Sequence, residues 1–426
     1  MNNYWQELDR KLIWHPFTPL QEKGLPLLVE SAKGCYLHLS DGRKIIDAVS
    51  SWWVNIHGHS NEYIANAIYK QALEMEHVIF AGFTHKPAIT IADRLLKILP
   101  GDMKRLFFSD NGSTAVEVAL KMVMQFWHNQ HIKKQKIIAL EGSYHGDTFG
   151  AMSIGSRGIF TEPFSPYLFE VEFINLENAE QEFYDLVKNN DVAAFIYEPL
   201  VQGTAGMRIY PAALLEQLIS IAREHDVLCI ADEVMTGFGR TGKLFASEYC
   251  QLPPDIICMS KGITGGFMPL GATACSERIE NVFMNNKREK MFFHGHSYTA
   301  NALSCAAANA SLDLLLKEET MQQIRMIEQH HLAFIERIRY NPNVLNIKCQ
   351  GTILSIELKT GDETSYFNEL RDLLYNFFLS EDILLRPLGN IIYILPPYII
   401  NYEELELVYK AIEKMLVNSK VFPEPS

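Results

Sequence analysis

Short apolar runs alternate with segments of helical periodicity through the middle of the chain, from about residue 60 to about residue 315. The runs are too short for helices and are rich in branched or aromatic residues, which is typical of buried strands. They lie at 105–108, 136–140, 193–197, 227–231 and 256–260. Between them, apolar residues recur every three or four positions, which predicts amphipathic helices. This alternation predicts an α/β fold with a mostly parallel sheet.

The two ends of the chain have a different pattern. Residues 1–55 predict an irregular arm with short strands, including a hairpin around Asp41-Gly42. Residues 56–317 contain the alternating pattern and predict a large domain, and residues 318–426 mix helical and strand patterns, which predicts a smaller α+β domain. A chain of 426 residues exceeds the usual size of a single core. We expect the arm to pack with the small domain.

Three of the predicted strands are each followed by one ionisable residue: Glu198, Asp232 and Lys261. In open α/β sheets, ligands bind outside the carboxyl ends of the strands, so these side chains are expected to face one cleft. A glutamate at a strand end is often only solvated, but three such residues together favour a site. Pyridoxal phosphate requires a lysine that forms a Schiff base and an aspartate for its pyridinium nitrogen.

Two further motifs follow predicted strands. Gly112-Ser113 precedes a helical segment, where backbone N–H groups, hydroxyls and the helix dipole favour a phosphate group. The alternative interpretation is an ordinary helix cap, because Ser and Thr are preferred there in any case. Tyr144 or His145 could stack on a flat cofactor, the alternative being a loop aromatic packed on the core.

Candidate substrate residues lie in three other segments. Trp52 and Trp53 could wall a pocket, or one could pack in the core and the other at an interface. The glycine-rich stretch 237–242 does not match a dinucleotide-binding fingerprint, and its Arg240 could bind a carboxylate or, taken alone, make a surface ion pair. Arg386 ends another predicted strand. It could bind a carboxylate in the cleft or, alternatively, form an ion pair at the domain interface.

Composition narrows the class of partner. The formal charge of −13 argues against nucleic acid and anionic membranes. The seven cysteines include no CxxC pair, which is typical of a reduced cytoplasmic protein. The spacing of His57 and His59 does not favour zinc, and no metal site is expected. The first residues do not resemble a signal peptide, and no apolar stretch approaches the ~20 residues of a membrane span. These exclusions leave small molecules as the expected substrates.

Together these motifs resemble the fold-type I, class III aminotransferases that use pyridoxal phosphate, over nearly the whole chain. The motifs that carry the resemblance are Gly112-Ser113, Tyr144-His145-Gly146, Glu198-Pro199, Ala231-Asp232-Glu233-Val234, Gly237-Phe238-Gly239-Arg240 and Ser260-Lys261-Gly262. Within the family the chain is most similar to the branch that aminates 8-amino-7-oxononanoate to 7,8-diaminononanoate in biotin biosynthesis. That likeness rests on Trp14-His15-Pro16-Phe17-Thr18, Ser50-Ser51-Trp52-Trp53, the segment 144–150 and Pro396-Pro397-Tyr398-Ile399-Ile400.

The resemblance implies a role for each site residue and a homodimer whose active sites lie at the subunit interface. The catalytic residues would be Lys261, which holds the cofactor, Asp232, which pairs with its ring nitrogen, and Tyr144. The cofactor-binding residues would be Gly112, Ser113, Tyr144, Glu198, Asp232, Lys261 and His296, with Ser297 from the partner subunit. The substrate-binding residues would be Phe17, Trp52, Trp53, Tyr144, Arg240, Arg386 and Tyr393, with Gly295 from the partner subunit.

Two departures bear on the substrates. Phe17 stands where the family often has Tyr, so one hydroxyl to the keto substrate is missing. Trp52 is typical of enzymes that use S-adenosylmethionine as amino donor, whereas His296-Ser297-Tyr298-Thr299 looks closer to the lysine-using branch. S-adenosylmethionine is the expected donor, with lysine as the alternative. The chain is also compatible with a class III enzyme for ω-amino acids or polyamines, with an aminomutase, and with a non-catalytic protein that kept the fold.

Overall fold

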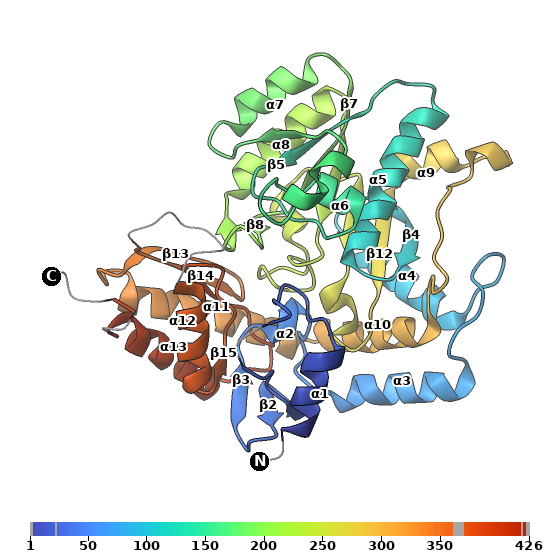
Figure 1. Ribbon diagram of the computed structural model, residues 1–426. Helices are drawn as coiled ribbons and strands as arrows, with labels where there is room; N and C mark the ends of the chain where they lie inside the picture. The colour runs from blue at the N-terminus through green and yellow to red at the C-terminus, as the bar shows by residue number, and fades with distance from the viewer. Residues whose placement is uncertain (1–2, 22–23, 361–369, 419–420, 423–426) are drawn as a thin grey trace.

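A seven-stranded sheet forms the centre of the molecule (Figure 1), in the order β4-β12-β11-β10-β7-β5-β6. The computed structural model describes residues 3–21, 24–360, 370–418 and 421–422. Its strands are β4 (Met103–Ser109), β5 (Lys136–Leu140), β6 (Glu172–Ile174), β7 (Val192–Tyr197), β10 (Leu228–Asp232), β11 (Ile256–Met259) and β12 (Gly271–Ser276). Only β12 runs antiparallel to its neighbours β4 and β11. The predicted α/β fold with a mostly parallel sheet is confirmed.

Each strand of this sheet packs against apolar side chains on both faces. Along β10, Leu228 and Ile230 belong to one core and Cys229 to the other. Helix α5 (Gly112–Asn129) contributes to the first core and α8 (Ala212–Glu224) to the second. Because both faces are covered, the strands are apolar at nearly every position, which is why they stand out as continuous runs in the sequence.

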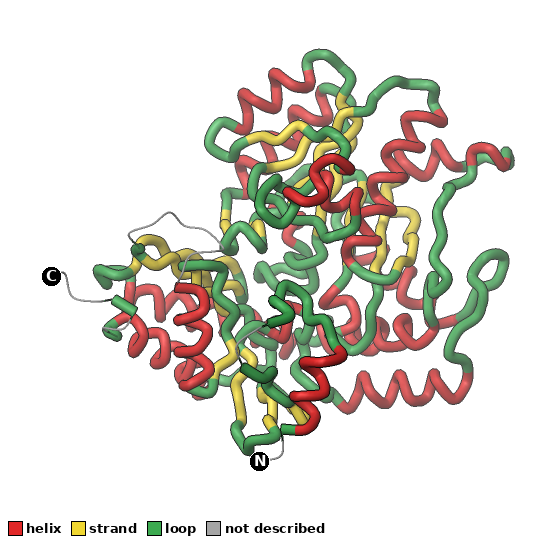
Figure 2. The backbone as a smooth tube through the Cα atoms, viewed as in Figure 1, coloured by secondary structure: helices red, strands yellow, loops and turns green. Residues whose placement is uncertain are grey.

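The other helices of this region lie outside the sheet (Figure 2). They are α3 (Glu62–Glu74), α4 (Lys86–Ile98), α6 (Phe149–Ser153), α7 (Ala179–Val187), α9 (Glu277–Phe283) and α10 (Ala302–Leu315). Shorter elements are β8 (Val201–Gln202), β9 (Arg208–Ile209), and the 3₁₀ turns η1 (Glu162–Tyr167), η2 (Ala246–Tyr249), η3 (Lys261–Thr264) and η4 (Arg288–Lys290). Within the described residues, no helix is both long and apolar enough for a membrane span.

The C-terminal region has its own antiparallel sheet, in the order β13-β14-β16, with helices packed against it. Its elements are α11 (Glu318–Ile338), β13 (Val344–Gln350), β14 (Ile353–Leu358), α12 (Leu370–Ser380), β16 (Ile391–Ile394) and α13 (Tyr402–Leu416). Phe334 of α11 stacks on Tyr409 of α13 with ring centroids 4.2 Å apart. The arrangement is α+β, whereas the domain limits near residues 55 and 317 stay predictions.

The N-terminal strands form a sheet that the C-terminal region completes. After α1 (Tyr4–Leu12) come β1 (Val29–Lys33), β2 (Tyr36–Leu39) and β3 (Lys44–Asp47), and β2 and β3 form the predicted hairpin. The two-residue β15 (Ile383–Leu384) pairs in parallel with β3, opposite Ile46 and Asp47. This pairing places the segment after β3, α2 (Ser50–Trp53), beside the segment after β15, which carries Arg386.

Candidate active site

The carboxyl ends of three neighbouring strands, β7, β10 and β11, meet at one cavity of about 410 Å³. Glu198 follows β7 directly, Asp232 is the last residue of β10, and Lys261 comes two residues after β11. All three side chains line the cavity. Their predicted placement in one cleft is therefore confirmed, because parallel strands in register bring their ends to the same edge of the sheet.

Lys261 projects from a tight turn at the start of η3. Its φ of 47° lies in the left-handed region, which residues other than glycine rarely adopt. The hydroxyl of Ser260 donates to the carbonyl of Leu270 at 2.7 Å and fixes the residue before it. Burial lowers the pKa of Lys261 to about 8, although the carboxylates of Asp232 and Glu198 act to raise it. A substantial share of this amine is therefore neutral, and so nucleophilic, near pH 8.

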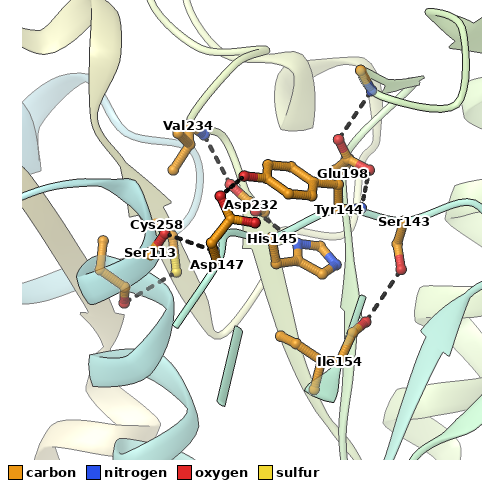
Figure 3. A network of polar contacts seen from close by, with 12 residues as sticks. Ser113, Ser143, Tyr144, His145, Asp147, Ile154, Glu198, Asp232, Val234 and Cys258 are labelled. Carbon is orange, nitrogen blue, oxygen red and sulfur yellow. Dashed lines mark hydrogen bonds and ion pairs between the residues drawn. The ribbon is translucent and has the colours of Figure 1, made fainter. Parts of the chain in front are cut away.

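Asp232 is oriented by two donors (Figure 3). Its Oδ2 lies 2.7 Å from Nδ1 of His145, and its Oδ1 accepts from the backbone N–H of Val234 at 3.0 Å. Both side chains are buried, and Nε2 of His145 finds no hydrogen-bond partner among the described residues. Sequence reasoning named His145 only as a stacking candidate and missed this pairing. The Tyr-His-Gly motif after β5 was the signal for it.

Glu198 faces the same cavity and is held by backbone donors. Its Oε2 accepts from Tyr144 N at 3.2 Å and its Oε1 from Gly203 N at 3.0 Å. Burial raises the pKa of Glu198 to about 7, His145 opposes the rise, and Asp232 adds to it. The carboxyl group therefore changes protonation near neutral pH, within the cavity that contains the Lys261 amine.

The start of α5 forms a cup at the cavity wall. Asn111 caps the helix by accepting from Thr114 N at 3.0 Å, and the Thr114 hydroxyl accepts from Asn111 N at 2.9 Å, which completes a capping box. The alternative of an ordinary helix cap therefore holds for Asn111 and Thr114, and Ser113 takes no part in it. The Ser113 hydroxyl accepts a contact of 3.3 Å from Asp147 N and keeps its proton for another acceptor. A Cβ at Gly146 would lie 2.0 Å from that oxygen, so only glycine leaves room for it.

These features fit pyridoxal phosphate. The helix start and Ser113 suit a phosphate, Asp232 suits a protonated ring nitrogen, and Lys261 suits an aldehyde. Tyr144 contributes a flat ring and Val234 an apolar side chain to the cavity wall. The cavity volume is typical of small-molecule sites, about 300–1,000 Å³. The wall at 266–270 was not identified from sequence, although the Gly265-Gly266 pair shortly after Lys261 marked a tight loop. No cluster of metal-binding side chains occurs in the described ranges.

The two neighbouring tryptophans have different surroundings. Trp53 is buried, lines the cavity and lies 4.4 Å from Nζ of Lys261, measured to its ring centroid. Its Nε1 donates to the hydroxyl of Tyr393 at 3.2 Å. Trp52 is 39% exposed and contacts the guanidinium of Arg386 at 4.6 Å and the ring of Phe17 at 6.0 Å. We call Phe17, Trp52 and Arg386 the outer cluster.

Arg386 carries an open guanidinium. Within the part of the chain that the structure describes, this group has the Trp52 ring as a neighbour and no hydrogen-bond or ion-pair partner. The predicted alternative of a domain-interface ion pair is therefore wrong for the described residues. A planar guanidinium that stacks on an indole and has its N–H groups unpaired can bind a carboxylate through two parallel hydrogen bonds.

Besides Tyr393 and the outer cluster, four predicted residues lie outside the cavity wall. Arg240 is almost fully buried and donates to the carbonyls of Pro396 at 2.7 Å and Trp53 at 3.3 Å. The expected surface ion pair is therefore wrong, because the loop folds this side chain under the ring of Tyr398. The other three lie in one surface segment, where Gly295 and Ser297 are exposed and His296 Nδ1 is 3.4 Å from an Asp110 oxygen: Gly295, His296 and Ser297.

Comparison with known proteins gives consistent matches over nearly the whole chain. The family model described as aminotransferase class-III matches residues 18–416. The chain is 47% identical over 418 residues to the adenosylmethionine-8-amino-7-oxononanoate aminotransferase of Synechococcus elongatus, covering 95% of this chain and 98% of the relative. It is 36% identical to the enzyme of the same name from Helicobacter pylori, covering 96% and 97%. The crystal structure of the Methanocaldococcus jannaschii enzyme of that name superposes with a TM-score of 0.91 at 34% identity, covering 97% of this chain and 99% of the other.

Proposed function

The chain belongs to the class III aminotransferases, and from that premise we propose that it transfers an amino group to 8-amino-7-oxononanoate, forming 7,8-diaminononanoate in biotin biosynthesis. The observation that carries the chemistry is one cavity lined by Lys261, Asp232 and the phosphate cup at the start of α5. The named relatives support the substrate, since enzymes of that name match 95% and 96% of this chain.

Class III aminotransferases use pyridoxal phosphate, whose ring withdraws electrons from the carbon that gains or loses the amino group. In this chain, Lys261 would hold the aldehyde and Asp232 the ring nitrogen, with Gly112 and Ser113 at the phosphate. His145 keeps the Asp232 carboxylate in one orientation. A fixed negative charge at this buried point stabilises a positive ring nitrogen more than a mobile one would.

Proton transfer falls to Lys261. Its Nζ, with a pKa of about 8, would take the proton from the donor carbon as a base and then deliver it, as an acid, to the aldehyde carbon of pyridoxal phosphate. The Trp53 ring beside Nζ keeps water from that side of the amine. Tyr144, whose hydroxyl donates to Asp147 at 3.0 Å, provides a further wall of the cavity. The base therefore works in a dry site, where its pKa stays low.

The outer cluster is the proposed site of the amino acceptor. Arg386 would bind its carboxylate, and Trp52 and Trp53 would pack along its apolar chain. Tyr393 supports this wall through its hydrogen bond to Trp53. Phe17 contributes a ring and no hydroxyl, so it would pack against the acceptor without donating to it. A long apolar acid with one carboxylate matches this combination of two indoles and one guanidinium.

Arg240 and the surface segment 295–297 complete the proposal. Arg240 uses two of its nitrogens for backbone carbonyls, and its Nε has no partner among the described residues, so it could reach a second carboxylate only after a rearrangement. We propose that segment 295–297 serves the active site of a partner subunit in a homodimer. Large apolar side chains are exposed within residues 79–83 and 291–298, which supports a surface that a partner subunit covers. They are Ile79, Phe83, Met291, Phe293 and Tyr298. The seven cysteines are all free, in keeping with a cytoplasmic location.

The test is product formation with each donor separately. Protein loaded with pyridoxal phosphate is mixed with 8-amino-7-oxononanoate and either S-adenosylmethionine or lysine, and 7,8-diaminononanoate is measured by mass spectrometry. We expect product with S-adenosylmethionine, and product with lysine alone would reassign the donor.

The Lys261→Ala variant is the control. It should keep its thermal unfolding temperature and form product at least about 10³-fold more slowly, because both the attachment point and the proton carrier are lost. No product with either donor, together with turnover of γ-aminobutyrate or ornithine, would refute the acceptor. Turnover of a single substrate without a donor would indicate an aminomutase.

A further inference from the structure

The turn that carries both tryptophans, Ser50–Trp53, has an unusual backbone. Ser50, Ser51 and Trp53 all have positive φ, at 50°, 61° and 69°. Ser51 also has a ψ of −69°. Residues other than glycine avoid this combination of φ and ψ. Such a conformation persists only when surrounding contacts hold it in place. The contacts that hold this turn therefore decide where Trp52 and Trp53 point.

The Ser50 hydroxyl donates to the carbonyl of Leu395 at 2.8 Å. The other side-chain hydrogen bonds that hold this turn converge on one carboxylate, that of Asp47. The side chain is fully buried and accepts from Val49 N at 3.2 Å and Ser51 N at 2.9 Å through Oδ1. Through Oδ2 it accepts from the Ser51 hydroxyl at 2.9 Å and lies 2.8 Å from His59 Nε2. Two of its four bonds go to Ser51, the residue with the most strained backbone. Sequence reasoning had not singled out Asp47, which simply closes an apolar strand.

The network continues from His59 to the cavity wall. Nδ1 of His59 lies 3.3 Å from the Asn55 amide nitrogen, so this ring accepts from Asn55 and donates its Nε2–H to Asp47. On its other side, the Asn55 oxygen is so close to Gly266 that a Cβ there would approach it to 2.1 Å. Gly266 lines the cavity. Asp47 therefore lies between the turn and a network that ends at the cavity wall.

The two tryptophans depend on this turn to different degrees. Trp53 has further anchors, since its Nε1 donates to Tyr393 and its carbonyl accepts from Arg240. Trp52 is exposed, and its ring contacts the ring of Phe17 and the guanidinium of Arg386. Within the described residues, its indole makes no hydrogen bond. Loss of the Asp47 contacts should therefore move Trp52 far more than Trp53.

We propose that Asp47 is a positioning residue for the amino acceptor: it holds Ser51 in its strained conformation and thereby sets Trp52 against Arg386. It touches neither cofactor nor substrate, and it acts through the turn. The inference rests on the proposed function, because it assumes that Trp52 and Arg386 bind the acceptor. Since Trp53 keeps its own anchors beside Lys261, the effect falls on acceptor binding and spares the chemical step.

The test compares Asp47→Ala with wild type in steady-state kinetics, at saturating donor and varied 8-amino-7-oxononanoate. We expect KM for the acceptor to rise roughly tenfold or more while kcat changes less than about threefold. The absorbance of the lysine-bound cofactor should stay unchanged. Asp41→Ala is the matched control, because Asp41 accepts two bonds from Arg43 in an exposed turn of the same hairpin, and it should match wild type in every measurement.

Two further variants keep the test decisive if Asp47→Ala folds poorly. Asp47→Asn keeps one acceptor oxygen for the two backbone N–H groups and should raise KM by less than Asp47→Ala. Adding Ser51→Gly to either variant should recover part of the KM, because glycine adopts the turn conformation without the carboxylate. That recovery is not expected of a residue that only stabilises the fold.

Three outcomes would overturn the proposal. The first is an acceptor KM within about twofold of wild type in both Asp47 variants. The second is a parallel loss of kcat and cofactor absorbance with a lower unfolding temperature, which indicates general destabilisation. The third is no recovery with Ser51→Gly. The proposed function is judged separately by product formation in the wild-type protein, so Asp47 variants without effect would leave it standing.

Discussion

The inner part of the site, around Lys261, and the outer cluster around Trp52 are built in different ways. The inner part takes its side chains from neighbouring strands of one sheet, and Asp232 and Lys261 are buried or half-buried there. The outer cluster joins residues from opposite ends of the chain, as the Trp53–Tyr393 hydrogen bond does across 340 positions. Reaction chemistry thus lies on the rigid sheet, and recognition lies on segments that tertiary contacts bring together. Changes in the two parts should therefore alter different kinetic constants.

The largest expected effect is that of Asp232→Asn in the inner part. An amide cannot stabilise a positive ring nitrogen as a carboxylate does, so kcat should fall about 10²- to 10³-fold. The KM for the acceptor should change little. Steady-state kinetics measures both constants.

The control for Asp232 is Asp255→Asn. Asp255 is partly buried at the opposite end of the same strands and accepts from Cys229 N at 2.9 Å. That variant should lower the unfolding temperature and leave kcat within a few fold. A kcat for Asp232→Asn equal to that of Asp255→Asn would remove Asp232 from the mechanism.

Arg386→Ala should have the opposite signature in the outer cluster. A charge-assisted hydrogen bond contributes about 1.5–3 kcal/mol, so its loss should raise the acceptor KM roughly 10- to 100-fold. Lysine at this position should recover only part of that loss, because an ammonium lacks the planar fork. The kcat at saturating acceptor should stay within a few fold. A drop in kcat with unchanged KM would show that the two parts are not separable.

The smallest effect concerns the pH dependence of cofactor attachment. Only the neutral amine of Lys261 reacts with the aldehyde, so the attachment rate should rise with pH and level off above about 8, where the lowered pKa lies. An exposed lysine would level off only above its ordinary value of 10.5. Stopped-flow absorbance of cofactor-free protein mixed with pyridoxal phosphate measures this profile.

Glu198→Gln sharpens that measurement. The Glu198 carboxylate acts to raise the pKa of Lys261, so its removal should shift the midpoint of the profile to lower pH. A shift to higher pH would mean that Glu198 acts mainly through the shape of the cavity rather than through its charge.

Several sequence predictions succeeded because they depended on neighbours along the chain. The strand ends at Glu198, Asp232 and Lys261 followed from apolar runs, and their convergence followed from the parallel sheet. The surface ion pair predicted for Arg240 was wrong for the opposite reason. Its partners are the carbonyls of Trp53 and Pro396, more than 150 positions away, and no local pattern indicated them. The pairing of His145 with Asp232 was missed for the same reason.

The sequence by itself determined the strands, their helices and the reactive residues at the strand ends, because burial on both faces of a sheet imposes a pattern that is local. Only the tertiary structure decided that Phe17, Trp52 and Arg386 meet, and that Asp47 holds the turn between them. The physical reason is that these contacts depend on the pairing of β15 with β3, two short strands more than 330 residues apart. Hydrogen bonds between distant backbones leave no periodic trace in the side chains that they bring together.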